Sequence, residues 1–196
     1  EAIKLTAAHE YHHAIQFGYD GYEKAWLFEA TATEMEEQIY DEINDCHTWL
    51  PGWFAEPQKS LDHPSDHWYG SFIFPQYIFE HFGGYITLRR IWQESVSDDS
   101  YYGDFSHQAI SLALSNEGSS FSDALNKMVI ANRVMSSSTN AGVFSYEEAD
   151  IYPVNGPATF QTITYSGGTD QSVTSTNLTR FASQYTRVNT SDPVLV

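Results

Sequence analysis

A short run of histidine and glutamate near the start of the chain has the residue types of a hydrolytic metal site. The segment His9-Glu10-Tyr11-His12-His13 contains the pattern His-Glu-x-x-His, with His9, Glu10 and His13 in the defining positions. On a helix, residues i and i+4 lie on one face about one turn apart, so the two imidazoles can bind one Zn²⁺. Glu10 lies beside them, where its carboxylate can take a proton from a metal-activated water. The pattern therefore predicts zinc-dependent hydrolysis, and the alternative is a surface helix with a solvated histidine cluster.

The residues around this pattern predict the helix that presents it. Gly18 indicates where the helix ends. A catalytic metal needs a partly dry cavity, so we expect apolar side chains to bury this helix. His12 points off the zinc face, and we expect it to pack or to form a hydrogen bond rather than bind metal, since three protein ligands suffice. The small and apolar residues around the histidines are Ala2, Ile3, Leu5, Ala7, Ala8, Ala14, Ile15 and Phe17.

The third protein ligand of a catalytic zinc must come from another segment, and Glu29 is the best candidate. A short loop over residues 18–23 follows the first helix, and a second helix is predicted to begin near residues 24–27. Because the return is short, the second helix can pack antiparallel to the first and present Glu29 to the metal. Glu36, two turns further on, either holds a ring N–H of a ligand histidine or belongs to a solvated acidic face. The other residues expected on that acidic face are Glu34, Glu37, Asp41 and Glu42.

Two segments together resemble a known class of metallopeptidases. His-Glu-x-x-His over residues 9–13, followed by Trp-Leu-x-Glu over residues 26–29, is similar to the gluzincins, which include thermolysin and the zinc aminopeptidases. The likeness is greatest to a group of secreted metalloproteases of that clan, and it is strong over residues 8–45 and weaker to about residue 94. It implies that His9, His13 and Glu29 bind zinc and that Glu10 is the general base. The chain departs from the pattern in the slightly short spacing of 15 residues between His13 and Glu29, and at Glu34, where an apolar or aromatic residue is expected.

The resemblance also implies a residue that stabilises the oxyanion formed during peptide hydrolysis. Gluzincins often use a tyrosine or histidine from a helix downstream of the third ligand, and residues 66–74 are the matching region. The position three residues before a glycine selects His67, whereas residue type selects Tyr69. Both residues stay candidates, beside the alternatives that Tyr69 is a half-buried core aromatic and His67 a loop residue.

The function implied by the resemblance is that of a secreted zinc metalloprotease acting on a peptide or protein substrate. Gluzincins usually have an N-terminal β lobe whose edge strand binds substrate, and we expect a further domain or chain to supply it here. One alternative is an extracellular structural or surface-assembly component that retains a metalloprotease-like zinc site. Another is a carbohydrate- or ligand-binding module with incidental histidines. The intact Glu10 argues against both, because a purely structural zinc site needs no base.

Composition excludes several other classes of function. The formal net charge is −17 and the pI is about 4.5, so a nucleic-acid partner is excluded, because phosphate binding requires a basic surface. Cys46 is the single cysteine, so the chain has no internal disulfide framework. It also lacks a run of 18 apolar residues, so no membrane span is expected.

Composition changes near Asp150 and predicts an α+β fold with two parts. Aspartate and glutamate number 24 in the first 150 residues and 2 in the last 46. We expect residues 1–150 to form a mainly α-helical zincin catalytic lobe, and residues 151–196 to form a β-rich segment. That segment is either the start of a β-sandwich or a strand pair packed on the lobe. Further helices are predicted at 72–82, 86–96, 105–114 and 121–135, and β structure at 158–165 and 181–188 around a turn at Gly167-Gly168.

Overall fold

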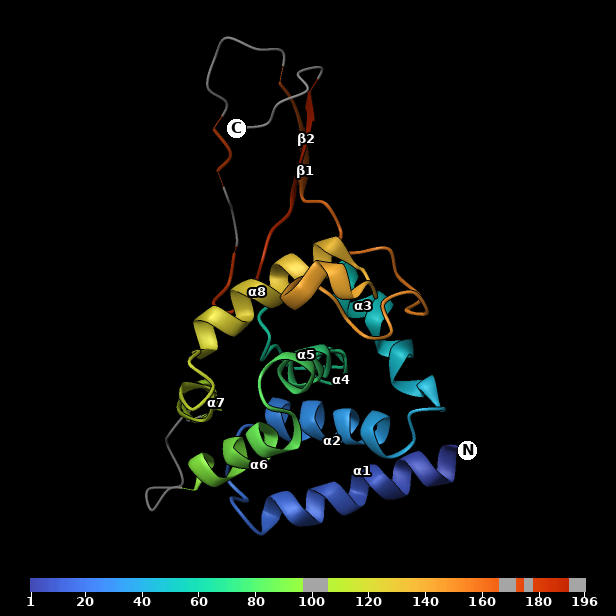
Figure 1. Cartoon of the computed structure of the whole chain (residues 1–196), viewed down its shortest axis with the longest axis vertical. Helices are drawn as coiled ribbons and strands as arrows, with labels where there is room; N and C mark the ends of the chain where they lie inside the picture. The colour runs from blue at the N-terminus through green and yellow to red at the C-terminus, as the bar shows by residue number, and fades with distance from the viewer. Residues whose placement is uncertain (97–105, 166–171, 175–177, 191–196) are drawn as a thin grey trace.

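The computed structural model describes residues 1–96, 106–165, 172–174 and 178–190. These residues form a mainly helical α+β fold, as the sequence predicts (Figure 1). The helices are α1 (Ala2–Phe17), α2 (Ala25–Ile39), η1 (Asn44–Trp49), α3 (Leu50–Ala55), α4 (His67–Gly70), α5 (Ile73–His81), α6 (Gly84–Ser95), α7 (Ser106–Ser115), α8 (Phe121–Val134) and η2 (Thr139–Phe144). The strands are β1 (Gln161–Tyr165) and β2 (Thr186–Thr190). None of the described helices has both the length and the apolar character needed to cross a bilayer.

Helix α2 lies at the centre of the helical body. It packs against α1 on one side and against α4, α5 and η1 on others, and Figure 1 shows it running back antiparallel to α1. Its buried residues therefore point in several directions around the helix, and they include charged ones. They are Trp26, Leu27, Phe28, Ala30, Thr31, Ala32, Thr33, Glu34 and Glu37.

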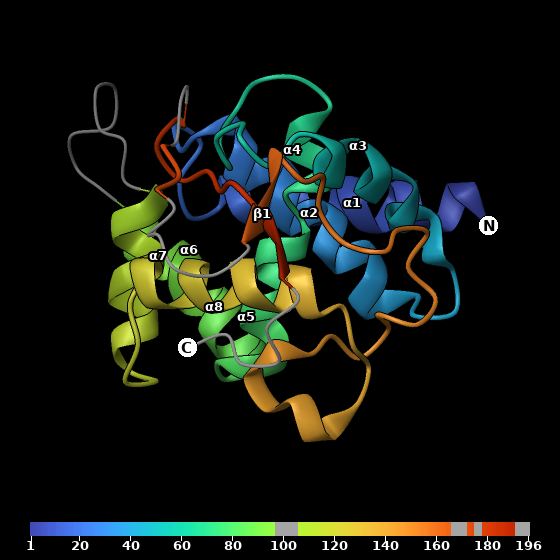
Figure 2. The same cartoon turned by 90° about the horizontal axis from the view of Figure 1, so that it is seen from above.

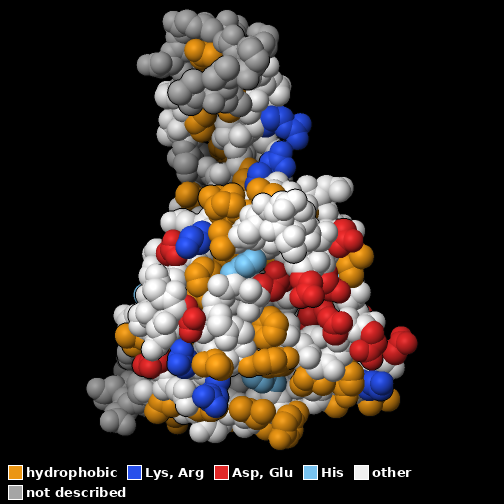
Figure 3. All heavy atoms as spheres, in the orientation of Figure 1, with side chains coloured by type: hydrophobic (Ala, Val, Ile, Leu, Met, Phe, Trp, Pro, Cys, Tyr) orange, Lys and Arg blue, Asp and Glu red, His pale blue; other side chains and the backbone are white. Residues whose placement is uncertain are grey.

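Helix α1 is far more exposed than α2. Of residues 2–17, all of which the structure describes, only Leu5, Ala8 and Gln16 are buried. Ile3 is 86% exposed and Phe17 64% exposed, so the expectation that apolar side chains bury this helix is wrong. The reason is that α2 covers one face of α1, and the apolar side chains on the other face lie along the lower edge of the molecule in Figure 3.

The helices after α4 follow the predicted boundaries closely. The helix predicted at 72–82 is α5, and Pro75 lies in its first turn, where its missing N–H costs no helical hydrogen bond. Gly83 then takes a left-handed conformation with φ of 87°, which favours glycine and separates α5 from α6. The Ser120 side chain caps α8 by accepting a hydrogen bond from the Asp123 N–H. These helices surround a core rich in aromatic side chains, including Phe54, Phe72, Phe74, Tyr77 and Tyr146.

The C-terminal residues form a two-stranded parallel sheet, in which Gln161 pairs with Thr186. The strand predicted within 158–165 is β1, whereas β2 begins five residues later than predicted, and Gly167-Gly168 lies outside the described residues. The strands project from the helical body in Figure 1 and lie over its middle when seen from above in Figure 2. At their base, the Ala158 N–H donates to Phe54 O at 2.8 Å, so the ribbon is tied to the helices.

Candidate metal centre

Helices α1 and α2 bring His9, His13 and Glu29 together. The Oε2 atom of Glu29 lies 3.2 Å from His9 Nε2 and 3.8 Å from His13 Nε2. One ligand atom from each of the three residues lies within 4.8 Å of the other two. Zinc bonds of about 2.0–2.1 Å in a tetrahedron place two ligand atoms roughly 3.4 Å apart. The spacing of the three side chains therefore fits one zinc ion, with the fourth position left for water or substrate.

This arrangement follows from local structure in residues 9–29. The two histidines are one turn apart on α1, so they share a face. After Gly18, the loop contains a turn in which the Asp20 side chain accepts a hydrogen bond from the Tyr22 N–H at 2.7 Å. Helix α2 then begins at Ala25 and carries Glu29 in its second turn. The short antiparallel return predicted from the sequence is present, and it brings Glu29 to the histidines.

Glu36 contacts His9, so the first of its two sequence interpretations fits the geometry. His9 Nδ1 lies 2.6 Å from Glu36 Oε1, and the Glu36 side chain is 16% exposed. A carboxylate accepts hydrogen bonds, so Nδ1 carries a proton. Nε2 also faces a carboxylate, Glu29 Oε2 at 3.2 Å, and donates to it in the metal-free protein. A metal would replace the Nε2 proton, while Glu36 continues to hold the ring through Nδ1.

Gln16 performs the same role for His13, and sequence reasoning missed it. Its side-chain nitrogen donates to Phe28 O and to Thr31 Oγ1, both at 2.9 Å. A backbone carbonyl can only accept, so the amide nitrogen must face Phe28, and Oε1 is the atom that faces His13. His13 Nδ1 lies 2.6 Å from this oxygen and must therefore donate to it, so Nε2 is the ring nitrogen turned toward Glu29. The one signal in the sequence is the i+3 spacing from His13.

The charges at the centre favour a cation between His9 and Glu29. Burial acts to lower the pKa of His9, but hydrogen bonds and charge interactions with Glu29 and Glu36 outweigh it and raise the pKa to about 9. The hydrogen bond to His9 in turn holds the pKa of Glu29 below its usual value. Metal ions compete with protons for such groups, so the same carboxylates also favour a bound metal.

Tyr69 lies beside this centre. Its ring centroid is 6.3 Å from that of His9, and the ring stacks on Trp49 with 4.8 Å between centroids. Burial and the charge of Glu29 raise the pKa of the Tyr69 phenol, and the charge of Glu10 acts in the same direction. The phenol is therefore protonated at neutral pH and can donate a hydrogen bond. Glu10 itself is exposed on α1.

His67, the other candidate for the oxyanion, packs elsewhere. Its ring stacks on Trp53 with 5.9 Å between centroids and meets the His63 ring edge-on at 5.9 Å. Burial lowers the pKa of His67 to about 4, so it is neutral at pH 7. The structure therefore places Tyr69, and not His67, next to Glu29.

His12 lines a cavity of about 340 Å³ between α1, α2 and α6, separate from the hollow that His13 and Glu29 line. Apolar side chains, among them Met35, Leu88 and Trp92, line this cavity. Burial and the neighbouring histidines lower the pKa of His12 to about 4. The side chain therefore lies where a packing residue is expected.

The expectation of a solvated acidic face on the second helix is wrong for two of its residues. Glu34 is fully buried and Glu37 is 4% exposed, whereas Asp41 and Glu42 are exposed. The cause is the central position of α2, which leaves little of its surface to solvent before its last turn.

Comparisons with known proteins give no match, so a functional conclusion rests on the chemistry of this centre. No protein-family model matches the chain, and no curated protein and no solved structure matches it either. The likeness to gluzincins accordingly rests on the His-Glu-x-x-His and Trp-Leu-x-Glu segments.

Proposed function

We propose that the protein is a zinc-dependent peptidase in which His9, His13 and Glu29 hold the ion. The observation that carries this proposal is the shared orientation of the two imidazoles. Glu36 and Gln16 each accept from an Nδ1, so both Nε2 atoms are turned toward Glu29. A solvated histidine cluster has no need of such positioned partners, whereas metal ligands are commonly held in this way.

The residues around the centre suit the hydrolysis of a peptide bond. A zinc ion bound there would polarise the scissile carbonyl and lower the pKa of a water. Glu10 then accepts the proton of that water and returns it to the leaving amine. The Tyr69 phenol donates a hydrogen bond to the carbonyl oxygen as that oxygen gains negative charge.

Substrate class and location belong to the same proposal and are supported by the resemblance to gluzincins. We expect peptide or protein substrates, secretion, and a β lobe supplied by a further domain or chain. A hollow of about 330 Å³ opens beside His13 and Glu29, with Phe17 and Phe28 in its lining, and offers an apolar surface to a substrate side chain.

Metal content is the first test of the proposal. Protein supplied with zinc and then desalted is analysed by elemental mass spectrometry. His9→Ala and Glu29→Ala should each hold one zinc fewer per chain than the wild type. His12→Ala is the matched control, since it removes a histidine from the same helix, and it should keep the full content. Equal zinc content in all four proteins would refute the ligand assignment.

Turnover is the second test and uses a pool of quenched fluorescent peptides. Glu10→Gln should keep its zinc and lose at least about 10²-fold in rate. Glu94→Gln removes an exposed carboxylate from α6 and should leave the rate unchanged. Full activity in Glu10→Gln would overturn the mechanism. A wild type that holds zinc at this centre yet cleaves nothing would favour the structural, surface-assembly alternative.

A further inference from the structure

A second group of side chains with metal-ligand chemistry lies on another face of α2. Glu37 is about 100° around this helix from Glu36, so it points away from His9. Its carboxylate meets Cys46 and His47 of η1, and one ligand atom from each of the three lies within 4.8 Å of the others. All three residues are buried, with exposed fractions of 2–5%.

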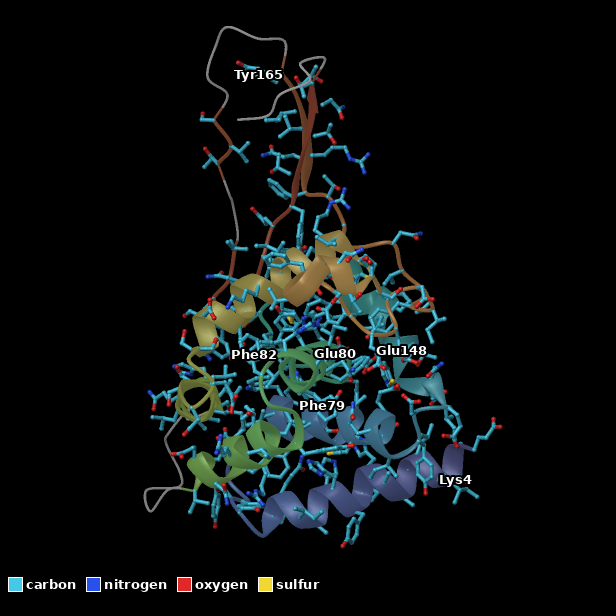
Figure 4. All side chains as sticks on the ribbon, viewed as in Figure 1. Lys4, Phe79, Glu80, Phe82, Glu148 and Tyr165 are labelled. Atoms are coloured by element: carbon cyan, nitrogen blue, oxygen red, sulfur yellow. The ribbon has the colours of Figure 1, made fainter. Side chains whose placement is uncertain are left out.

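A fourth side chain reaches this group from a distant part of the chain. Glu148 follows η2, and its Oε2 lies 3.2 Å from His47 Nε2. It also forms a hydrogen bond with Glu37. In Figure 4, Glu148 lies to the right of Glu80, beside the turn of chain between α2 and α3. Glu37, Asp41 and Glu148 form a second trio whose ligand atoms lie within 4.8 Å of one another, so Glu37 belongs to both trios.

The cluster has an excess of negative charge in a buried place. Burial raises the pKa of Glu37 to about 8, and the charges of Glu148 and Asp41 act in the same direction. Burial also raises the pKa of Glu148, with further contributions from Asp41 and Glu147. Carboxylates that crowd together away from water must either hold protons or share a cation.

Glu34 provides an independent observation that points to a ligand. Its side chain is 0% exposed, and neither carboxylate oxygen has a well-formed hydrogen bond among the described residues, although the Gln38 side chain lies close enough to lower its pKa. The charge of Glu37 raises the pKa of Glu34, and the charge of Glu34 raises that of Cys46, so Glu34 borders the same cluster. A buried carboxyl group with so little hydrogen bonding is costly, and a nearby divalent cation would offset that cost.

We propose that Glu37, Cys46 and His47 bind a second divalent transition metal ion, with Glu148 as the fourth ligand. Thiolate, imidazole and carboxylate together suit zinc, and a site closed by four protein ligands is of the structural kind. Without the ion, the Cys46 thiol donates to Glu37 Oε2 at 3.0 Å. On binding, the thiol proton and the proton held by the carboxylates leave to solvent, and the sulfur lone pair forms the bond to the metal. The ion would fasten α2, η1 and the segment around residue 148 to one another.

Cobalt is the probe for this site, because a cobalt–thiolate bond gives an intense near-ultraviolet charge-transfer band. Cys46 is the single cysteine of the chain, and the centre formed by His9, His13 and Glu29 contains no sulfur. A charge-transfer band therefore reports the second site alone. The protein, kept reduced by a non-thiol reductant, is titrated with Co²⁺ under ultraviolet–visible spectroscopy, and bound metal is counted after desalting.

The expected result is a charge-transfer band that saturates at one equivalent of cobalt. The band should survive in His9→Ala, which separates it from the catalytic centre, and disappear in Cys46→Ser with the loss of one ion per chain. His47→Ala should weaken cobalt binding at this site by at least tenfold.

The wild-type titration decides the matter by itself, so a variant that fails to fold does not obscure it. Folded wild-type protein that shows no such band at excess cobalt would overturn the proposal, and the cluster would then be a hydrogen-bonded network of protonated acids. A band that never saturates would equally overturn it, since it would indicate a thiol that binds cobalt without a built site.

Discussion

Replacing Gln16 by methionine tests whether the support of His13 matters to the metal. Methionine keeps the length and volume of glutamine but forms none of its three hydrogen bonds, which join Gln16 to His13, Phe28 and Thr31. The variant leaves the His13 Nδ1–H without an acceptor, so the ring no longer has a preferred tautomer or orientation.

The size of the effect follows from this geometry. Losing the partner of a metal-bound histidine typically costs 10–100-fold in metal affinity, which corresponds to about 1.4–2.7 kcal/mol. Gln16 is fully buried, and each of its three hydrogen bonds contributes about 1 kcal/mol net, so the free energy of unfolding should fall by about 2–4 kcal/mol.

The assay measures zinc affinity by competition with a chromophoric chelator. The affinity is evaluated for the zinc ion whose binding is lost in His9→Ala, which is the ion at the candidate metal centre. Urea denaturation of the metal-free protein gives the stability term separately. Gln76→Met is the matched control, because Gln76 is also a buried glutamine, but its amide contacts Glu80 and Gln38 and not the metal centre. It should lose stability and keep its affinity for zinc. A folded Gln16→Met protein that binds zinc within about threefold of the wild type would refute the reasoning, since the lower end of the expected loss is tenfold.

Three further predictions concern other parts of the molecule. Tyr69→Phe should lower kcat by about 10²-fold with little change in KM or zinc content. Steady-state kinetics and metal analysis measure these quantities, and loss of zinc would indicate a structural role instead. Burial raises the pKa of Glu80 to about 7, against 4.5 in an unfolded chain. Between pH 4.5 and 7 the folded state therefore binds more protons than the unfolded state. The free energy of unfolding should fall by up to about 3 kcal/mol as the pH rises through this range. Glu80→Gln should remove that loss when urea denaturation is compared at pH 4.5 and 8, and an unchanged difference would contradict the assignment. Gly70→Ala places a Cβ 2.6 Å from Trp53 Cβ and should lower the free energy of unfolding by about 1–3 kcal/mol. Gly52→Ala is the control, since its new Cβ has no atom within 4 Å, and its free energy of unfolding should not fall. Thermal denaturation of both variants measures the difference.

The candidate metal centre was largely predictable because its determinants are local. Helical spacing brings His9 and His13 onto one face, and the short loop before α2 brings Glu29 back to them. Glu36 follows from the same periodicity. Gln16 has no comparable signal, because a glutamine three residues after a histidine is common. Its importance arises from burial under α2, which only the packed structure reveals.

The buried acidic cluster was not predictable, because burial of a helix face depends on what the rest of the chain places over it. From the sequence, Glu34 and Glu37 have the spacing of a solvated acidic face. The structure covers them with η1 and with the segment that carries Glu148, more than 100 residues further along the chain. The C-terminal strands show the same limit. The β-rich composition of 181–188 predicts a strand there, but the start of β2 lies five residues later, because it is set by the pairing of Thr186 with Gln161 of β1.

The one-sided packing of α1 means that metal supply should govern how firmly this helix is held. Few of its side chains are buried. Its polar links to α2 include the hydrogen bonds from Gln16 to Phe28 and Thr31, and the contacts of His9 and His13 with Glu29, which would hold zinc. At free zinc 100 times the dissociation constant, the ion would add about 2.7 kcal/mol to the docking of the helix. Amide hydrogens of α1 would then exchange at a rate set by the zinc concentration, while those of α5, deep in the aromatic core, would not. A chain without zinc at the proposed centre would release its first helix before the rest of the fold opens, and so expose Leu5 and Ala8, the apolar side chains that this helix buries.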